Sequence, residues 1–229
     1  MEIIANESLI RRNARIGQIT SIVGLLVLAG GMYISFARPE LFNLSLLALL
    51  VGFALSQIGI YFSNRYGKHP RPDESLDLAL KGLDGRYTMY HYKTPASHLL
   101  VGPSGIWVLS PRSTRGLITY NESRRRFAQK GGNLYLKIFA QESLGRPDME
   151  ISGEVEGVTS FLKQHLPEKE LPEVQAALVF TNEATQVEAD NAPIPTMQIK
   201  KLKEFIRKTA KGKTLSPETI NEINTALGE

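Results

Sequence analysis

Side chains able to do chemistry are scattered along this 229-residue chain rather than grouped in a motif. The chain has no cysteine, which excludes thiolate catalysis, disulfides and cysteine-ligated zinc or iron–sulfur sites. Its histidines lack metal-binding spacing, and we expect His98 to be structural; they are His69, His91, His98 and His165. The sequence also has no glycine-rich phosphate loop, no G-x-S-x-G elbow and no H-E-x-x-H motif. The common signatures of enzymes are therefore absent.

Basic residues form two clusters. One is Arg124, Arg125 and Arg126; the other is Lys200, Lys201, Lys203, Arg207, Lys208, Lys211 and Lys213. We interpret both as solvated faces, because residues 73–229 hold 20 basic and 20 acidic side chains and are neutral overall. The alternative is that they bind an anionic ligand, either lipid headgroups or nucleic acid. The net charge of +4 comes from residues 1–72, which hold seven basic and three acidic side chains.

Two long runs without a charged residue predict a pair of transmembrane helices. They cover residues 16–37 and 41–64, and neither has a polar face. A helix of 22 to 24 residues is about 33–36 Å long, enough to cross a hydrocarbon core of about 30 Å. A buried hairpin of a soluble protein or a cleaved signal peptide fits less well, because both runs are long and the second follows at once.

The flanks of these helices predict their orientation and their packing. Basic residues lie before the first span and after the second, which places both termini in the cytoplasm; they are Arg11, Arg12, Arg15, Arg65, Lys68 and Arg71. Ala48, Gly52 and Ser56 are spaced by four residues on one face of the second helix. Such a stripe allows close approach of the first helix within the hairpin, which we favour, or of a second copy in a dimer.

The rest of the chain predicts an α/β domain around one mixed sheet, assigned to residues 73–213, with a final helix in 214–229. Helices are expected at 73–82, 150–165 and 200–211, and after Ser216 as a capping residue. Strands are expected at 87–92, 97–101, 106–109 and 196–199, and the continuous apolar run 174–181 predicts a strand buried on both faces. Residues 117–120 and 126–129 are expected to continue the antiparallel sheet, while 134–141 stays open between strand and helix.

One stretch is more specific than any motif above. Residues 96–112, Ala-Ser-His-Leu-Leu-Val-Gly-Pro-Ser-Gly-Ile-Trp-Val-Leu-Ser-Pro-Arg, with Gly116 shortly after, resemble the centre of the NERD (nuclease-related) domain. That family is related to the restriction-endonuclease-like fold. The resemblance extends to Arg146-Pro147-Asp148 before the long helix and to the late apolar strand 177–182, so it covers roughly residues 73–211. It implies a restriction-endonuclease-like, mixed-sheet fold.

The chain departs from the family at the residues that would do chemistry. In the family, the first strand of the hairpin begins with a metal-binding Asp and the second ends in Glu-x-Lys. These positions fall on Ser97, Ser110 and Arg112, and only Glu74 lies near the family's first-helix glutamate. Nuclease chemistry in this fold needs clustered carboxylates around Mg²⁺, and an arginine does not replace the lysine. The resemblance therefore implies a degenerate active site.

The leading hypothesis is a membrane-anchored, catalytically inactive NERD-like domain, without a cofactor, that acts as a cytoplasmic binding or scaffold module for a protein partner. One alternative is a membrane-tethered, Mg²⁺-dependent nuclease in which Glu74 and Glu122 form a rearranged carboxylate site near Ser97. The other is a non-catalytic nucleic-acid tether that carries both basic clusters on one face.

Overall fold

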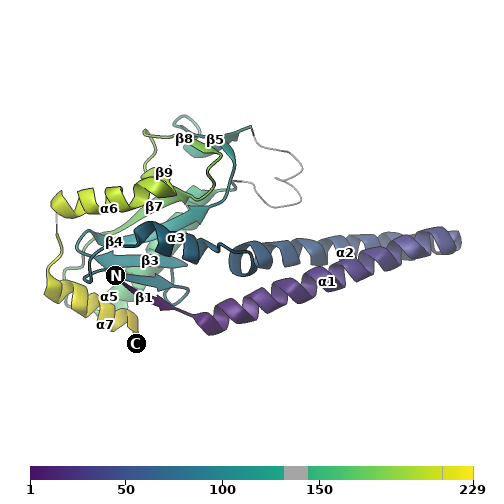
Figure 1. Cartoon of the computed structure of the whole chain (residues 1–229), viewed down its shortest axis with the longest axis horizontal. Helices are drawn as coiled ribbons and strands as arrows, with labels where there is room; N and C mark the ends of the chain where they lie inside the picture. The colour runs from purple at the N-terminus through teal and green to yellow at the C-terminus, as the bar shows by residue number, and fades with distance from the viewer. Residues whose placement is uncertain (132–143, 213, 229) are drawn as a thin grey trace. The chain divides into compact units, whose positions relative to one another are not determined.

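The computed structural model describes residues 1–131, 144–212 and 214–228 (Figure 1). These residues divide into two units, of which one is a helical hairpin and the other an α/β domain. Residues 134–141, which the sequence left open between strand and helix, lie outside the described residues.

The helical hairpin contains the two long apolar helices that the sequence predicts. Helix α1 spans Glu7–Ala37 and helix α2 spans Phe42–Phe62; the 3-10 turn η1 (Pro39–Leu41) joins them, and the π-helical turn η2 (Ser63–Gly67) follows. Both helices are long and apolar enough to cross a membrane. Only 11% of the most apolar 18-residue stretch of each helix is buried. A helix from the core of a soluble protein would be mostly buried instead.

Small residues at seven-residue intervals hold α1 and α2 together. The buried positions are Gly17, Gly24 and Gly31 on α1, and Ser45, Gly52 and Gly59 on α2. A Cβ atom on Gly24 would lie 2.7 Å from Ser56 Oγ, and one on Gly52 would lie 2.8 Å from Leu28 Cγ. The stripe of Ala48, Gly52 and Ser56 therefore faces α1 within the hairpin, which is the use that we favoured over a dimer contact.

The α/β domain is built on a mixed sheet in the order β1-β2-β3-β4-β7-β9 among the described residues. Its strands are β1 (Glu2–Ala5), β2 (Thr88–His91), β3 (His98–Gly102), β4 (Gly105–Arg112), β7 (Val174–Phe180) and β9 (Thr196–Gln198). Strands β2, β3 and β4 are antiparallel neighbours, whereas β1, β7 and β9 each pair in parallel. The expected mixed sheet is thus confirmed. The apolar run 174–181 forms the predicted strand, and Ala177, Leu178, Val179 and Phe180 are fully buried within it.

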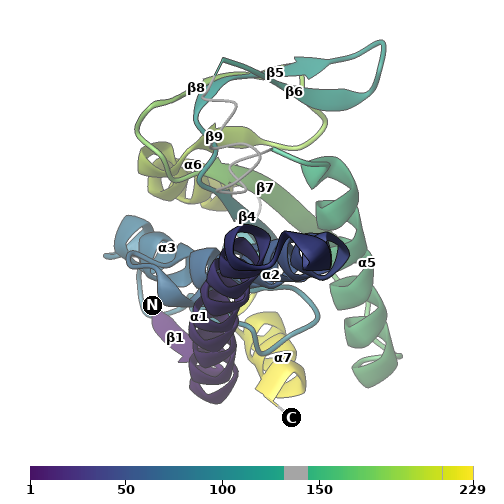
Figure 2. The same ribbon diagram turned by 90° about the vertical axis from the view of Figure 1, so that its right-hand side faces the viewer.

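Helices cover both faces of this sheet (Figure 2). Helices α3 (Pro72–Leu80) and α6 (Ile199–Gly212) bury apolar side chains on one face, among them Leu76, Leu80, Leu202 and Ile206. Helices α5 (Pro147–His165) and α7 (Pro217–Gly228) do the same on the other face, with Val158, Leu162, Ile220 and Ile223. Ser216 caps α7 as expected, since its Oγ accepts the Thr219 N–H at 3.1 Å.

Two strands that we expected in the central sheet form a separate sheet instead. Strand β5 (Gly116–Asn121) pairs with β6 (Arg126–Lys130) and, in parallel, with β8 (Thr185–Glu188). The sequence did not predict β8, because Thr-Gln-Val-Glu has a single apolar residue. Strand β7 occupies the edge of β4 that a continued meander would have used.

The two units are divided differently from our expectation, which assigned all of residues 1–72 to the hairpin. Residues 1–6 belong to the α/β domain, because β1 pairs with β2 from Glu2 opposite Thr88 to Ala5 opposite His91. The final helix α7 packs on the same sheet rather than forming a segment of its own. The domain is therefore built from two stretches of chain, one on each side of the hairpin.

Candidate functional site

The hairpin of β3 and β4 carries the residues that the resemblance aligns with a nuclease centre, Ser97, Ser110 and Arg112. Its turn begins at Gly102, where a Cβ atom would lie 2.3 Å from the Tyr87 ring, and ends at Gly105, which has a φ of +113°. Leu99 pairs with Val108 in the antiparallel ladder. Continuing this register by two residues places Ser97 opposite Ser110, as the resemblance implies for the two strands.

A carboxylate from helix α5 occupies the position beside Ser97. Glu154 Oε1 accepts the Ser97 backbone N–H at 3.2 Å and the Ser97 hydroxyl at 2.7 Å. The two residues are 57 positions apart in the sequence, so this contact joins α5 to the start of β3. A carboxylate is a strong acceptor for both groups, and the pair fixes the end of the strand against the helix.

The end of β4 is joined to the same helix. The Arg112 guanidinium forms an ion pair with Glu150, and the Thr181 N–H donates to the Arg112 carbonyl at 2.9 Å. Glu150 and Glu154 are four residues apart, which places them on one face of α5. The sequence reasoning missed both glutamates, although their i, i+4 spacing on a predicted helix was visible.

These residues do not fit a magnesium ion, the cofactor that the nuclease alternative requires. Mg²⁺ prefers carboxylate and water oxygens, whereas Ser97 offers a hydroxyl that already donates to Glu154. Arg112 places a permanent positive charge beside Glu150, where a cation would have to bind. In the part of the chain that the structure describes, no three His, Asp or Glu side chains converge as a set of ligands.

The two carboxylates of the rearranged-site hypothesis lie elsewhere. Glu74 is in the first turn of α3, and Glu122 is in the turn between β5 and β6. Glu122 accepts a hydrogen bond from Asn191 Nδ2 at 2.8 Å. The carboxylate that accepts hydrogen bonds from Ser97 is that of Glu154, a residue that the rearranged-site hypothesis did not include.

A buried polar chain that the sequence did not predict lies on the neighbouring strands. His91 Nδ1 and His98 Nδ1 are 2.8 Å apart, so one ring donates to the other, and His91 Nε2 lies 3.0 Å from Asp77 Oδ1. Both histidines are almost fully buried, and the Tyr92 ring packs edge-on against His98. The hydrogen bonds satisfy the buried rings and tie β2 and β3 to α3. The hydrogen bond and burial of His98 fit the structural role that we expect for it.

The two basic clusters lie on separate elements. Arg124 and Arg125 are in the turn between β5 and β6, at the far end of that hairpin from α6 in Figure 2, and Arg126 begins β6. Lys200, Lys201 and Lys203 are in the first turns of α6. Lys203 donates to the Lys81 carbonyl at 3.0 Å, and Arg207 donates to the Gly82 carbonyl at 2.8 Å. These two side chains cap the C-terminal end of α3, which is a structural use.

Comparisons with protein-family models, with characterised proteins and with solved structures find no match to this chain. The function proposed below is therefore argued from the geometry of the chain and from the resemblance carried by residues 96–112.

Proposed function

We propose that the chain is a membrane-anchored NERD-like domain that acts as a cytoplasmic binding or scaffold module rather than as a nuclease. One observation carries the proposal. At two of the three positions that the resemblance aligns with the family's metal ligands and lysine, side chains link the sheet to α5: Ser97 to Glu154 and Arg112 to Glu150. Positions that would hold the metal ligand and the lysine in the family therefore hold the sheet against α5 in this chain.

The order of the elements supports the family resemblance. A tight Gly-Pro-Ser-Gly hairpin joins β3 to β4, the long helix α5 begins directly after Arg146, and the apolar strand β7 pairs in parallel with β4. These are the parts that the resemblance implies for a restriction-endonuclease-like fold. Our inference is that the fold was kept while its chemistry was lost.

The helical hairpin supports the membrane anchor. Its exposed surface is apolar, with Leu25, Leu26 and Phe36 each more than 60% exposed, and residues 16–37 contain no charge. Strands β1 and β2 flank the hairpin in the sequence and pair in one sheet, so the chain must leave and return on the same side of a membrane. The basic residues beside both helices support a cytoplasmic location for that side.

A cleavage assay tests the absence of nuclease activity. The full chain in detergent micelles is incubated with single- and double-stranded DNA and RNA in Mg²⁺ or Mn²⁺, beside the variants Glu154→Ala and Glu74→Ala. We expect all three proteins to leave the substrates intact, because Ser97, Ser110 and Arg112 replace the residues that the family uses to hold Mg²⁺ and activate water. Cleavage by the native chain that either substitution abolishes would overturn the proposal.

A further inference from the structure

The outer edge of β7 is open over its first half. In the described part of the chain, β9 pairs with β7 only from Leu178 to Phe180, while β4 covers the other edge along the whole strand. The Leu178 N–H points to the β9 side, where it donates to the Pro195 carbonyl at 2.9 Å. Because backbone groups alternate along a strand, the N–H and C=O groups of Val174 and Ala176 point to the same open edge.

The sequence before β9 explains why the edge is open. Residues 193–195 are Pro-Ile-Pro and would lie beside the first half of β7 if the strand began earlier. Proline has no backbone N–H and cannot donate to a ladder, so pairing begins only at Thr196. The Pro-Ile-Pro segment borders a groove instead of filling it.

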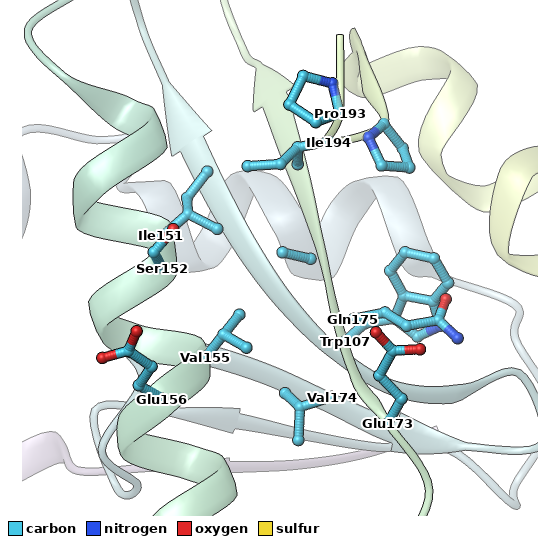
Figure 3. Close-up of a pocket in the computed structure, with 12 residues that line it drawn as sticks. Trp107, Ile151, Ser152, Val155, Glu156, Glu173, Val174, Gln175, Pro193 and Ile194 are labelled. Atoms are coloured by element: carbon cyan, nitrogen blue, oxygen red, sulfur yellow. The ribbon is translucent and has the colours of Figure 1, made fainter. Parts of the chain in front are cut away.

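The groove is large enough for an extended chain and is mostly apolar. Its volume is about 400 Å³. Ile151 and Val155 of α5 line one side, Ile194 lies above them, and Trp107 lies across β7 (Figure 3). The open edge from Val174 to Ala177 is four residues long, or about 13 Å at the rise of a strand.

Two carboxylates give the groove its charge. Glu156 of α5 and Glu173, just before β7, lie at its border, and none of the described residues that line it is basic (Figure 3). Both are exposed, and neither forms an ion pair with any residue that the structure describes. The groove therefore favours a positively charged occupant and disfavours nucleic acid or anionic lipid.

We propose that this groove binds an extended, basic segment of a partner protein, which adds as a strand to the open edge of β7. Its backbone pairs with Val174 and Ala176, an apolar side chain packs on Ile151 and Val155, and a Lys or Arg side chain lies beside Glu156 or Glu173. This inference names the partner class of the proposed binding module. It does not depend on the state of the nuclease-type centre, so the two proposals fail on different measurements.

The single tryptophan of the chain provides a direct readout, because Trp107 lines the groove. The probe is the peptide acetyl-Lys-Val-Lys-Val-Lys-Val-amide, titrated into the full chain in neutral detergent while Trp107 emission is recorded. The first control peptide has Glu in place of each Lys. The second keeps the sequence but carries N-methyl groups on alternate backbone amides, so that one edge of the peptide strand has no N–H donors. We expect saturable binding of the first peptide, and binding at least about tenfold weaker for both controls.

Charge-reversal variants locate the binding on the molecule. The double variant Glu156→Lys/Glu173→Lys is compared with the control variant Glu183→Lys. Glu183 is exposed and lies in the turn between β7 and β8. We expect the double variant to weaken binding by about tenfold or more and the control to change it by less than about twofold. All three positions are exposed, so the variants test the surface rather than the fold.

Three outcomes would overturn the proposal. The first is the absence of a saturable change in emission with the basic peptide. The second is equal binding of the N-methylated peptide, which would exclude strand addition. The third is a dimer of the native chain in light scattering that Glu173→Lys dissociates, which would make the groove an interface between two copies.

Discussion

The Glu154 carboxylate accepts two hydrogen bonds from Ser97, one from its backbone N–H at 3.2 Å and one from its hydroxyl at 2.7 Å. By the resemblance that we propose, Ser97 corresponds to a metal-binding aspartate of the NERD family. An aspartate there would be repelled by Glu154, unless a cation lay between the two carboxylates. With serine, the same helix position becomes a structural link that needs no metal. On the proposed resemblance, a single change from aspartate to serine would remove the metal ligand and form the link.

This link predicts a stability effect. Glu154→Ala removes the carboxylate that accepts two hydrogen bonds from Ser97, and we expect the free energy of unfolding to fall by about 1–3 kcal/mol. The measurement is denaturant unfolding of the full chain in micelles, followed by Trp107 emission. The matched control is Glu156→Ala, on the same helix but exposed and without an ion pair among the described residues, with an expected change within about 0.5 kcal/mol. Equal effects of the two substitutions would contradict a specific role for Glu154.

The glycines of the hairpin predict a steric effect with an internal control. A side chain on Gly24 would collide with Ser56, whose backbone N lies 2.9 Å from the ideal Cβ position, whereas nothing lies within 4 Å of that position at Gly30. We expect Gly24→Leu to lower the melting temperature of the full chain in micelles and Gly30→Leu to leave it unchanged. If both variants melted like the native chain, α1 and α2 would not pack through this face.

The pairing of β1 with β2 predicts the topology of the anchor. Because the chain has no cysteine, single cysteines introduced at Glu40 and Glu183 are unique labelling sites. We expect a membrane-impermeant maleimide to label Glu40→Cys in intact bacterial cells and Glu183→Cys only after permeabilisation. Labelling of Glu183→Cys in intact cells, with Glu40→Cys protected, would reverse the orientation. Equal labelling of both would exclude a membrane-spanning hairpin.

Tyr90 predicts a loss of stability at alkaline pH. Burial, with a smaller contribution from the Glu2 charge, raises the pKa of Tyr90 from 10.0 to about 12. Below pH 10 the phenol is neutral in both states; between about pH 10 and 12 the unfolded chain loses its proton first, so stability falls by roughly 2–3 kcal/mol. Tyr90→Phe should remove this part of the pH dependence. It should also cost about 1 kcal/mol at neutral pH, because the hydroxyl donates to Asn224 at 3.2 Å. If the free energy of unfolding of Tyr90→Phe fell between pH 9 and 12 as steeply as that of the native chain, the raised pKa of Tyr90 would not be the cause of the loss.

Much of the architecture was predictable because its signals are local. The apolar run 174–181, the Gly-Pro-Ser-Gly turn and the helical spacing of Ile151, Val155 and Val158 each lie within one element, and each prediction is confirmed. The uncharged runs likewise predicted the two long helices. Local periodicity reports which face of an element is buried, and that information is complete within a few residues.

The remaining features depend on contacts between distant segments. Strand β1 pairs with β2 more than 80 residues later, and Ser97 meets Glu154 across 57 residues. Short strands such as β8, with one apolar residue in four, have no periodicity that could be recognised. The seven-residue spacing of Gly17, Gly24 and Gly31 is visible in the sequence, but the predicted close packing rested on the stripe of the second helix alone.

Manganese binding by the full chain in micelles tests the central claim most directly, with the triple variant Ser97→Asp/Ser110→Glu/Arg112→Lys as the comparison. The full chain is required because a fragment that begins at residue 73 lacks strand β1. We expect calorimetry to detect no Mn²⁺ binding to the native chain and measurable binding to the triple variant, in which carboxylates replace Ser97, the neighbour of Glu154, and Ser110. Micromolar Mn²⁺ binding by the native chain, lost on Glu154→Ala, would show that the centre still holds a metal and would contradict the account.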